Sequence, residues 1–438
     1  MVFAEDFLHY IWKFRLYRKN ELLTEDNEFL QIISPGLQHH HSGPDFQHAK
    51  IRIGDTLWVG NVEIHIRASD WLQHNHSQDP AYNNVILHVV YQNDAAIQNE
   101  AGLKMPVLVL KDRISEQLFL QYQNLIFTKQ TNFPCEKIVH RVNQLTIQNW
   151  LDRMLIQRLE KKSIHVFEIL KQQKGNWEET FYQLLASSFG FKVNALPFEL
   201  LAKSLPLPIL SKHSFNLQQT EALIFGQAGF LADQIDDPYY LLLQKNYQFL
   251  KQKYSLLPLE KHLWKFLRLR PSNFPTVRLA QFAALMHRKD RFLAEIIYAE
   301  NTDHADTSFT SINPSAYWLD HYQFGRLSKP VSKNLGQSSV ENILINTVAV
   351  LLFSLGTEAQ SVEQRSKALS VLENLPCENN YIISSFITAG LKIKTAADSQ
   401  ALIELKNDFC DKKRCLECGI GHQLLKTNDY AATDSNLF

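Results

Sequence analysis

The sequence predicts an α+β protein, in which an N-terminal α/β domain with a mixed sheet precedes a larger, mostly helical region. Strand-like alternation of apolar and polar residues lies before about residue 128, and helical periodicity dominates after about residue 130. The content of 45% apolar and 21% charged residues is ordinary for a globular chain. We expect domains at 1–128 and 129–330, and a helical C-terminal region with a cysteine cluster at 331–438.

The N-terminal domain is expected to hold one helix and several strands. Residues 5–17 place apolar side chains at helical spacing, which predicts the helix. In the run 56–66, Val62, Ile64 and Ile66 alternate with polar residues, which predicts a half-buried strand. The further strands are expected at 29–34, 49–53, 85–91 and 107–110.

The rest of the chain carries helical periodicity, with charged residues between the apolar ones. Proline and glycine separate the segments, and Pro197 is one of these separators. The helices are expected near 147–170, 179–189, 217–232, 239–255, 259–269, 276–299, 339–355, 361–373 and 397–409.

The charge balance excludes binding to nucleic acid or membrane through total charge. Basic and acidic residues both number 45, so such binding has to come from a local patch. The N-terminal residues lack the pattern of a secretory signal. The most apolar stretch, 347–355, is short, because a spanning helix needs about 20 residues. Five cysteines are too few for a disulfide framework, and we expect a cytoplasmic protein outside the membrane.

Three carboxylates form the first candidate site. Glu5 lies on the expected first helix, Asp45 follows Gly43-Pro44 at a turn, and Glu63 lies on the expected strand 56–66. Carboxylates on neighbouring strands can share a hard cation such as Mg²⁺, which prefers oxygen ligands. The cation would activate a water and neutralise charge on a phosphate. The structural alternative is that Asp45 caps the turn and Glu63 pairs with Arg52 or Arg67.

The runs GPDF (43–46) and WVGNVEIH (58–65) resemble motifs II and III of the PD-(D/E)XK nuclease superfamily, over about 90 residues. The resemblance implies an αβββαβ core in which Asp45 and Glu63 hold Mg²⁺ or Mn²⁺, the Ile64 carbonyl helps, and Glu5 positions water or a second ion. His65 stands where the superfamily has a lysine that orients the water or stabilises the transition state. A histidine can donate a proton near neutral pH, or its presence means altered chemistry or lost activity.

Longer strings are similar to a bacterial family of unknown function, in a match that extends along the chain. They are EDFLHYIWKFRL (5–16), the run 58–91 and CDKKRCLECGIG (410–421). This resemblance implies no activity, but it implies that the N-terminal core and the cysteine segment belong together.

A histidine-rich stretch forms a second candidate site, composed of Asp70, His74, His76 and Asp79. On a strand the two histidines would face one way and suit Zn²⁺ or Mn²⁺, whereas on a helix starting at Asp70 they would not. The alternative is a polar turn held by hydrogen bonds. His88 belongs either to the core or to the site, and the triplet 39–41 is a loop at the site mouth or a solvated loop.

A basic segment, 261–289, contains no acidic residue and interleaves its cations with aromatic side chains. Basic side chains neutralise phosphates and aromatic rings stack on bases, so the segment is a candidate contact for DNA or RNA. On a helix, Lys261, Lys265 and Arg268 would share one face; the alternative is a solvated cationic face. The candidate residues are Lys261, Lys265, Arg268, Arg270 and Arg278.

The last candidate site is the spacing Cys410-x4-Cys415-x2-Cys418, followed by His422. Thiolates with an imidazole suit structural Zn²⁺, and the same spacing with a distant fourth cysteine suits an iron–sulfur cluster. Cys135 or Cys377 is the candidate for that fourth ligand. Some nucleases of the PD-(D/E)XK superfamily are similar in clamping a cluster with a terminal three-cysteine group and one remote cysteine. The alternative is three reduced thiols packed as small apolar groups.

The motifs of P-loop, dinucleotide-binding, HExxH and GxSxG proteins are absent from the sequence. The first functional hypothesis is a Mg²⁺- or Mn²⁺-dependent nuclease that uses Glu5, Asp45, Glu63 and His65. The second is a non-cleaving protein that holds nucleic acid through Lys265, Arg268 and Arg270. The third is a zinc-dependent hydrolase built on His74, His76 and Asp79.

Overall fold

A computed structural model describes residues 3–39, 42–100, 102–127, 131–288, 293–294, 309–310 and 312–426. Its contacts divide the chain into two compact units. The first unit comprises residues 1–150, 385–391 and 405–438, and the second comprises 151–384 and 392–404. The expected three-part division remains a prediction, and the units follow other lines because the cysteine segment packs with the N-terminal domain. The expected α+β class, with a mixed sheet and a large helical region, is confirmed.

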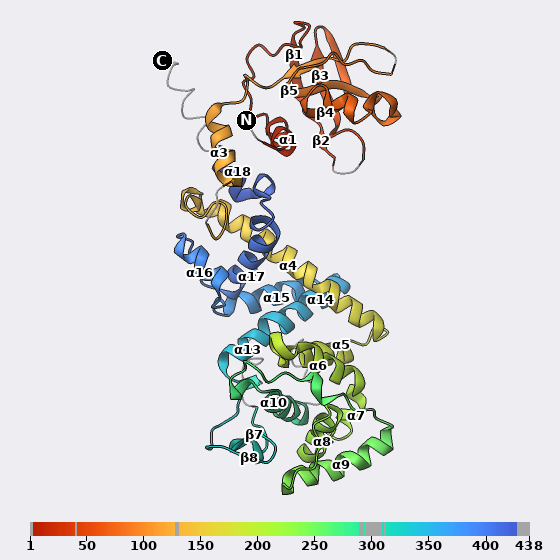
Figure 1. Ribbon diagram of the computed structural model, residues 1–438, viewed down its shortest axis with the longest axis vertical. Helices are drawn as coiled ribbons and strands as arrows, with labels where there is room; N and C mark the ends of the chain where they lie inside the picture. The colour runs from red at the N-terminus through yellow and green to blue at the C-terminus, as the bar shows by residue number, and fades with distance from the viewer. Residues whose placement is uncertain are drawn as a thin grey trace. The chain divides into compact units, whose positions relative to one another are not determined.

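The first unit is built on a mixed sheet with the strand order β1-β3-β4-β5-β6 and with β2 beside β3 (Figure 1). Strands β1, β3 and β4 are antiparallel neighbours, whereas β4, β5 and β6 run parallel. Every strand predicted from alternation is present. The strands are β1 Leu30–Ser34, β2 Leu37–Gln38, β3 Phe46–Ile53, β4 Thr56–Arg67, β5 Val85–Gln92 and β6 Val107–Val109.

Helix α1, Glu5–Phe14, packs against β4 through an apolar face that buries Phe7, Ile11 and Trp12. The sequence predicts this helix to residue 17. It ends earlier because Arg15 adopts a left-handed backbone, with φ 53°, and its N–H closes the last turn on the carbonyl groups of Ile11 and Trp12. The helix therefore presents its first two turns, which carry polar residues, to the sheet edge near Asp45.

The connection between β4 and β5 covers the other face of the sheet. It consists of α2 Asp70–Gln73, η1 His76–Gln78 and η2 Pro80–Tyr82. Trp71 and Tyr82 from this connection pack into one apolar cluster with Val90 and Val107 of the sheet. Because of this cover, β4 is buried on both faces from Val62 to His65, and the expectation of a half-buried strand is wrong there.

Further helices of the first unit come from both ends of the chain. Helix α3 packs against α18, which the sequence reading did not predict. These elements are α3 Glu116–Phe127, η3 Val139–Arg141, η8 Lys406–Cys410, η9 Cys415–Glu417 and α18 Gly419–Lys426.

The helical region begins with α4, Gln144–Gln172, and matches most of the predicted helices. Its other main helices are α5 Trp177–Phe189, α6 Phe191–Ser204, α7 Leu207–Ser211, α8 Leu217–Gln227, α9 Pro238–Tyr254, α10 Pro275–Arg288, α13 Gln337–Ile343, α14 Ala349–Glu358, α15 Val362–Asn374, α16 Tyr381–Thr388 and α17 Ala396–Leu405. Its short elements are η4 Lys261–Leu263, η5 Pro271–Asn273, η6 Ala316–Leu319, β7 His321–Gln323, β8 Arg326–Leu327 and the π-turn η7 Leu344–Val348.

The predicted helix 259–269 is wrong, because only the single turn η4 forms there. The side chain of Asn194 donates to the Lys265 carbonyl over 3.0 Å and accepts from the Lys265 N–H over 2.8 Å. These two bonds satisfy the backbone groups that a helix would have used. Pro197 is also no separator. It lies inside α6, where the backbone is non-helical at Asn194 and absorbs the kink.

One helix of the described chain, Gln337–Glu358, is long and apolar enough to cross a membrane by length and composition. It joins α13, η7 and α14 into one continuous stretch, longer than the apolar run that the sequence singles out. Within the second unit, 72% of its most apolar window is buried, as in a core helix.

A buried carboxyl in the second unit makes folding pH-dependent. Glu221 is fully buried on α8 and accepts hydrogen bonds from Tyr239 and Ser315. Burial raises its pKa from 4.5 to about 7. The folded state therefore favours the protonated form, and this contribution to stability is full below pH 4.5 and is lost as the pH rises through about 7.

We expect the free energy of unfolding to fall between pH 5 and 8 by roughly 3 kcal/mol more in the wild-type protein than in Glu221→Gln. The glutamine keeps the shape of the neutral carboxyl but cannot ionise. Urea titrations of both proteins at the two pH values measure the difference. An identical pH dependence of the two proteins would contradict the expectation.

Candidate metal centre

Asp45 and Glu63 meet at the junction of β3 and β4. Strands β3 and β4 pair in antiparallel register, with Phe46 opposite Val62. The Asp45 N–H donates to Glu63 Oε2 over 3.1 Å, and Asp45 Oδ2 accepts from the Ile64 N–H over 2.9 Å. The first carboxylate pair predicted from the sequence is therefore in direct contact. Among the described residues, no ion pair joins Glu63 to Arg52 or Arg67, which was the alternative reading.

Helix α1 brings two more side chains to Asp45. His9 Nε2 lies 3.2 Å from Asp45 Oδ2 and 3.9 Å from Glu5 Oε1. Burial lowers the pKa of His9, but the neighbouring carboxylates of Asp45 and Glu5 outweigh it and leave the pKa raised. The sequence reading missed His9. Its spacing of four residues from Glu5 puts both on one helix face, and this signal was available.

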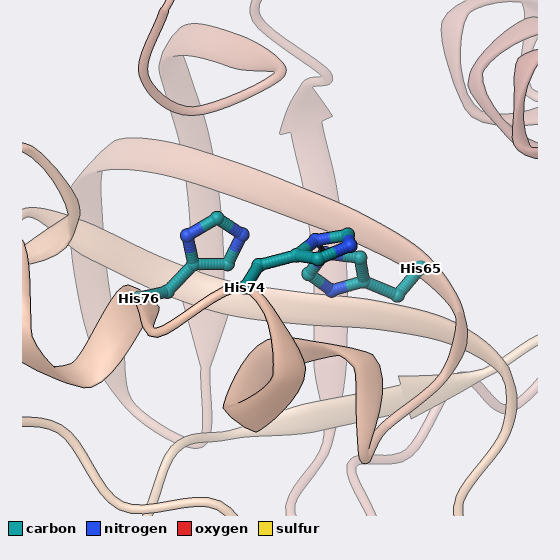
Figure 2. A group of neighbouring side chains, drawn as sticks. All are labelled: His65, His74 and His76. Atoms are coloured by element: carbon teal, nitrogen blue, oxygen red, sulfur yellow. Dashed lines mark hydrogen bonds between the residues drawn. The ribbon is translucent and has the colours of Figure 1, made fainter.

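Three histidines form a compact triad beside Glu63. Figure 2 shows the imidazoles of His65, His74 and His76 gathered in one place. One ring nitrogen of each lies within 4.8 Å of those of the other two, and His65 Nε2 lies 3.2 Å from His74 Nδ1. Ligands around a tetrahedral zinc at 2.0–2.1 Å lie about 3.3 Å apart. The triad therefore has the spacing of a three-histidine metal site.

Glu63 borders this triad. Its Oε1 atom lies 3.3 Å from His76 Nε2 and 3.6 Å from His65 Nε2. The two sites predicted separately from the sequence, the carboxylates and the histidine-rich stretch, are therefore one site.

The turn at Asn75 produces this convergence. The sequence offered a strand, on which His74 and His76 would point together, or a helix starting at Asp70, on which they would not. The helix α2 does start at Asp70, but Asn75 adopts a left-handed backbone with φ 58° between α2 and η1. Asparagine tolerates this conformation, and the reversal brings both rings over β4. The ring of His76 is fixed by stacking on Tyr82 at 3.8 Å.

His88 on β5 supports the triad from beneath. His65 pairs in register with Val90, so His88 lies on the same face, and its Nε2 is 2.9 Å from His65 Nδ1. Burial and the neighbouring histidines lower the pKa of His65 to about 2, and burial lowers that of His88 to about 4. His65 is thus a neutral imidazole oriented by a second ring, as metal-ligating histidines are. It cannot supply the positive charge of the lysine that it replaces.

The carboxylates of the site carry unfavourable charge in the absence of a cation. Burial, and then Asp45, raise the pKa of Glu63 to about 8, and burial raises that of Glu5 to about 7. His9 Nε2 and His76 Nε2 are buried and have no hydrogen-bond partner among the described residues. Orphaned imidazole nitrogens beside buried carboxylates fit a divalent cation, whose charge would compensate for both.

Asp70 and Asp79 do not join the site. Asp70 Oδ2 accepts from the Arg67 N–H, and Asp79 Oδ1 accepts from the Ala81 N–H, each over 2.9 Å. Both therefore close local turns, which is the polar-turn reading for these two residues. Of the triplet 39–41, His40 and His41 lie outside the described residues.

The basic segment lies in the second unit and is not a helix. Lys265, Arg268 and Arg270 are exposed in its extended part, and Lys261 pairs with Asp233. Arg278 is buried on α10 and donates to side-chain oxygens, so it is not part of a nucleic-acid surface. The predicted shared helix face of these cations is wrong, and Lys289 lies outside the described residues.

Four cysteines converge in the first unit. Cys135, Cys410, Cys415 and Cys418 line one small cavity. His422 instead meets α1, where its Nδ1 is 2.9 Å from the Tyr10 hydroxyl. Cys377 belongs to the second unit. Of the candidates for a fourth ligand, Cys135 is the one that lies with the other three.

Comparison with known proteins gives a family and no activity. The model of the family described as Protein of unknown function (DUF2851) matches residues 5–381, which include the whole metal centre but not Cys410, Cys415 and Cys418. No curated protein and no solved structure matches the chain. Because the match covers nearly the whole chain, the protein belongs to the DUF2851 family of proteins of unknown function.

Proposed function

We propose that the first unit is a divalent-cation-dependent nuclease that hydrolyses phosphodiester bonds in DNA or RNA. The observation that carries the proposal is the contact of Asp45 and Glu63 with each other and of Glu63 with the histidine triad. Acidic and imidazole ligands around one ion are the equipment of metal-assisted hydrolysis.

His65, His74 and His76 would hold the ion, which leaves a fourth position open, as in catalytic zinc sites. Bound there, the ion would lower the pKa of a water and offset negative charge on the phosphate. Glu63 is the nearest carboxylate and, because its pKa lies near neutrality, is suited to accept and return a proton. His9 lies between Glu5 and Asp45 and holds both in position.

The order of elements supports the nuclease class within this proposal. Helix α1, the antiparallel strands β1, β3 and β4, the helix α2 and the parallel strand β5 follow one another along the chain. This order is the one that the resemblance to the PD-(D/E)XK superfamily implies. The ligand set differs from that resemblance, because three imidazoles favour Zn²⁺ or Mn²⁺ over Mg²⁺.

The test is cleavage of single- and double-stranded DNA and RNA by the full chain after chelation and reloading with Mg²⁺, Mn²⁺ or Zn²⁺. We expect cleavage with Mn²⁺ or Zn²⁺, and its loss in Asp45→Ala and in Glu63→Ala. The matched control is His165→Ala, at an exposed histidine of α4 that contacts only Glu168 among its printed ion pairs.

Two other outcomes would redirect the proposal. Salt-dependent nucleic-acid binding without cleavage under any metal would favour the non-cleaving alternative. Metal-dependent hydrolysis of a nitrophenyl ester, with nucleic acids left intact, would favour a zinc-dependent hydrolase of another substrate class. The histidine triad is the specific observation in favour of that second candidate.

A further inference from the structure

A second metal site lies among the four cysteines, apart from the histidine triad, and does not depend on the proposed activity. Cys135 comes from the segment after α3, whereas Cys410, Cys415 and Cys418 lie on η8, η9 and the turn before α18. All four border one cavity, with Phe409 and Leu125 as apolar walls. Residues separated by most of the chain therefore place four soft ligands in one spot.

The local backbone is arranged to support a thiolate rather than a small apolar group. The N–H groups of Ile420 and Gly421 are directed at the Cys418 sulfur and stabilise its charged form. Gly421 has no space for a side chain, since a Cβ there would lie 2.2 Å from the Cys415 carbonyl oxygen. N–H groups donating to sulfur are typical of metal–thiolate sites, where they tune the centre.

The alternative of packed thiols does not account for this arrangement. Cys415 and Cys418 are buried, and all four cysteines are free of disulfides. Packing alone requires neither four sulfurs around a common cavity nor N–H groups directed at one of them. A metal centre requires both.

The spacing favours a cluster over one zinc ion. Among the described residues, the group of three or more candidate ligands that fits within 4.8 Å is the histidine triad, and no three cysteines meet this limit. Thiolates around one zinc at 2.3 Å would lie about 3.8 Å apart. Iron and sulfide between the ligands separate the thiolates further, and the x4 and x2 spacing is one used by iron–sulfur proteins.

We propose that Cys135, Cys410, Cys415 and Cys418 bind an iron–sulfur cluster. The cluster clamps the C-terminal segment to the first unit. From that segment, His422 contacts Tyr10 and lies 4.1 Å, between ring centroids, from Phe14. Both aromatic residues are on α1, the helix that carries Glu5 and His9. The cluster thus braces a helix of the metal centre without taking part in hydrolysis.

The test is purification of the full chain without oxygen, followed by iron, sulfide and zinc analysis and visible and electron paramagnetic resonance spectra. We expect about four irons and four sulfides per chain for a cubane cluster. Cys135→Ser should lose the iron and the visible absorption. Cys377→Ser, a matched control in the second unit, and His422→Gln should keep both.

Each result decides the proposal without reference to nuclease activity. Iron and sulfide that depend on Cys135 but not on Cys377 or His422 would support it. Stoichiometric zinc at these cysteines without sulfide, no metal at all, or iron unaffected by Cys135→Ser would overturn it. If Cys135→Ser fails to fold, Cys418→Ser and spectra of the wild-type protein during iron chelation give the same decision.

Discussion

The double variant His74→Ala/His76→Ala is expected to bind Zn²⁺ or Mn²⁺ at least about 100-fold more weakly than the wild-type protein. Replacing a residue that merely supports a ligand costs 10- to 100-fold in metal affinity, so removing two ligands costs more. Both histidines lie in the connection between α2 and η1, outside the strands of the sheet. The variant therefore keeps the sheet intact, which makes it a cleaner test than the removal of buried His65.

Two measurements check this expectation on the metal-free full chain. Calorimetric titration gives the affinity directly. Thermal unfolding gives it through linkage, because zinc at about a thousandfold its Kd stabilises the wild-type fold by about 4 kcal/mol. The double variant should show no such increase.

The control is Asp70→Asn/Asp79→Asn, which alters two neighbouring residues that close turns. This variant should lose about 1 kcal/mol of stability per position while retaining metal affinity. If the aspartates mattered for metal and the histidines did not, the assignment of ligands would be wrong.

Gly226→Ala is expected to destabilise the second unit by about 3 kcal/mol, in the upper range for overpacking a core. Gly226 is buried on α8, and a Cβ there would lie 2.1 Å from Cγ of Tyr247 on α9. The Tyr247 ring cannot withdraw freely, because it is buried and its hydroxyl donates to Gln227 Oε1 over 3.0 Å. The gain in helix propensity from glycine to alanine, about 1 kcal/mol, offsets only part of the clash.

Urea unfolding followed by far-ultraviolet circular dichroism measures this loss. Gly336→Ala is the matched control, because a Cβ at that position meets nothing within 4 Å. It should change stability by well under the loss seen at Gly226. Equal effects of the two substitutions would show that the close packing of α8 on α9 is not what excludes alanine at Gly226.

The sequence by itself determined the elements whose signal is local. Alternation and periodicity predicted α1 and the five strands to within a few residues, because one face of each element has to be apolar to be buried. The same patterns placed Glu63 and His65 on one strand and Asp45 at the entry to its neighbour. The two residues of one hairpin meet because the antiparallel register leaves little freedom.

Predictions from local spacing failed where a tertiary contact changed the backbone. The basic segment has a helical spacing of cations, but the Asn194 side chain takes the backbone groups of Lys265 and leaves an extended chain. Pro197 was expected to end a helix, but packing tolerates it inside α6. Local propensity is worth a fraction of a kcal/mol per residue, so a few specific contacts override it.

Only the tertiary structure decided which residues form each site. The reversal at Asn75 unites the histidine-rich stretch with the carboxylates, and the packing of α1 on β4 adds His9 to Asp45. Cys135 joins the C-terminal cysteines across most of the chain. Such contacts are set by how the two faces of the sheet and the chain ends are covered. No periodicity encodes this covering, because it depends on burial shared between segments distant in sequence.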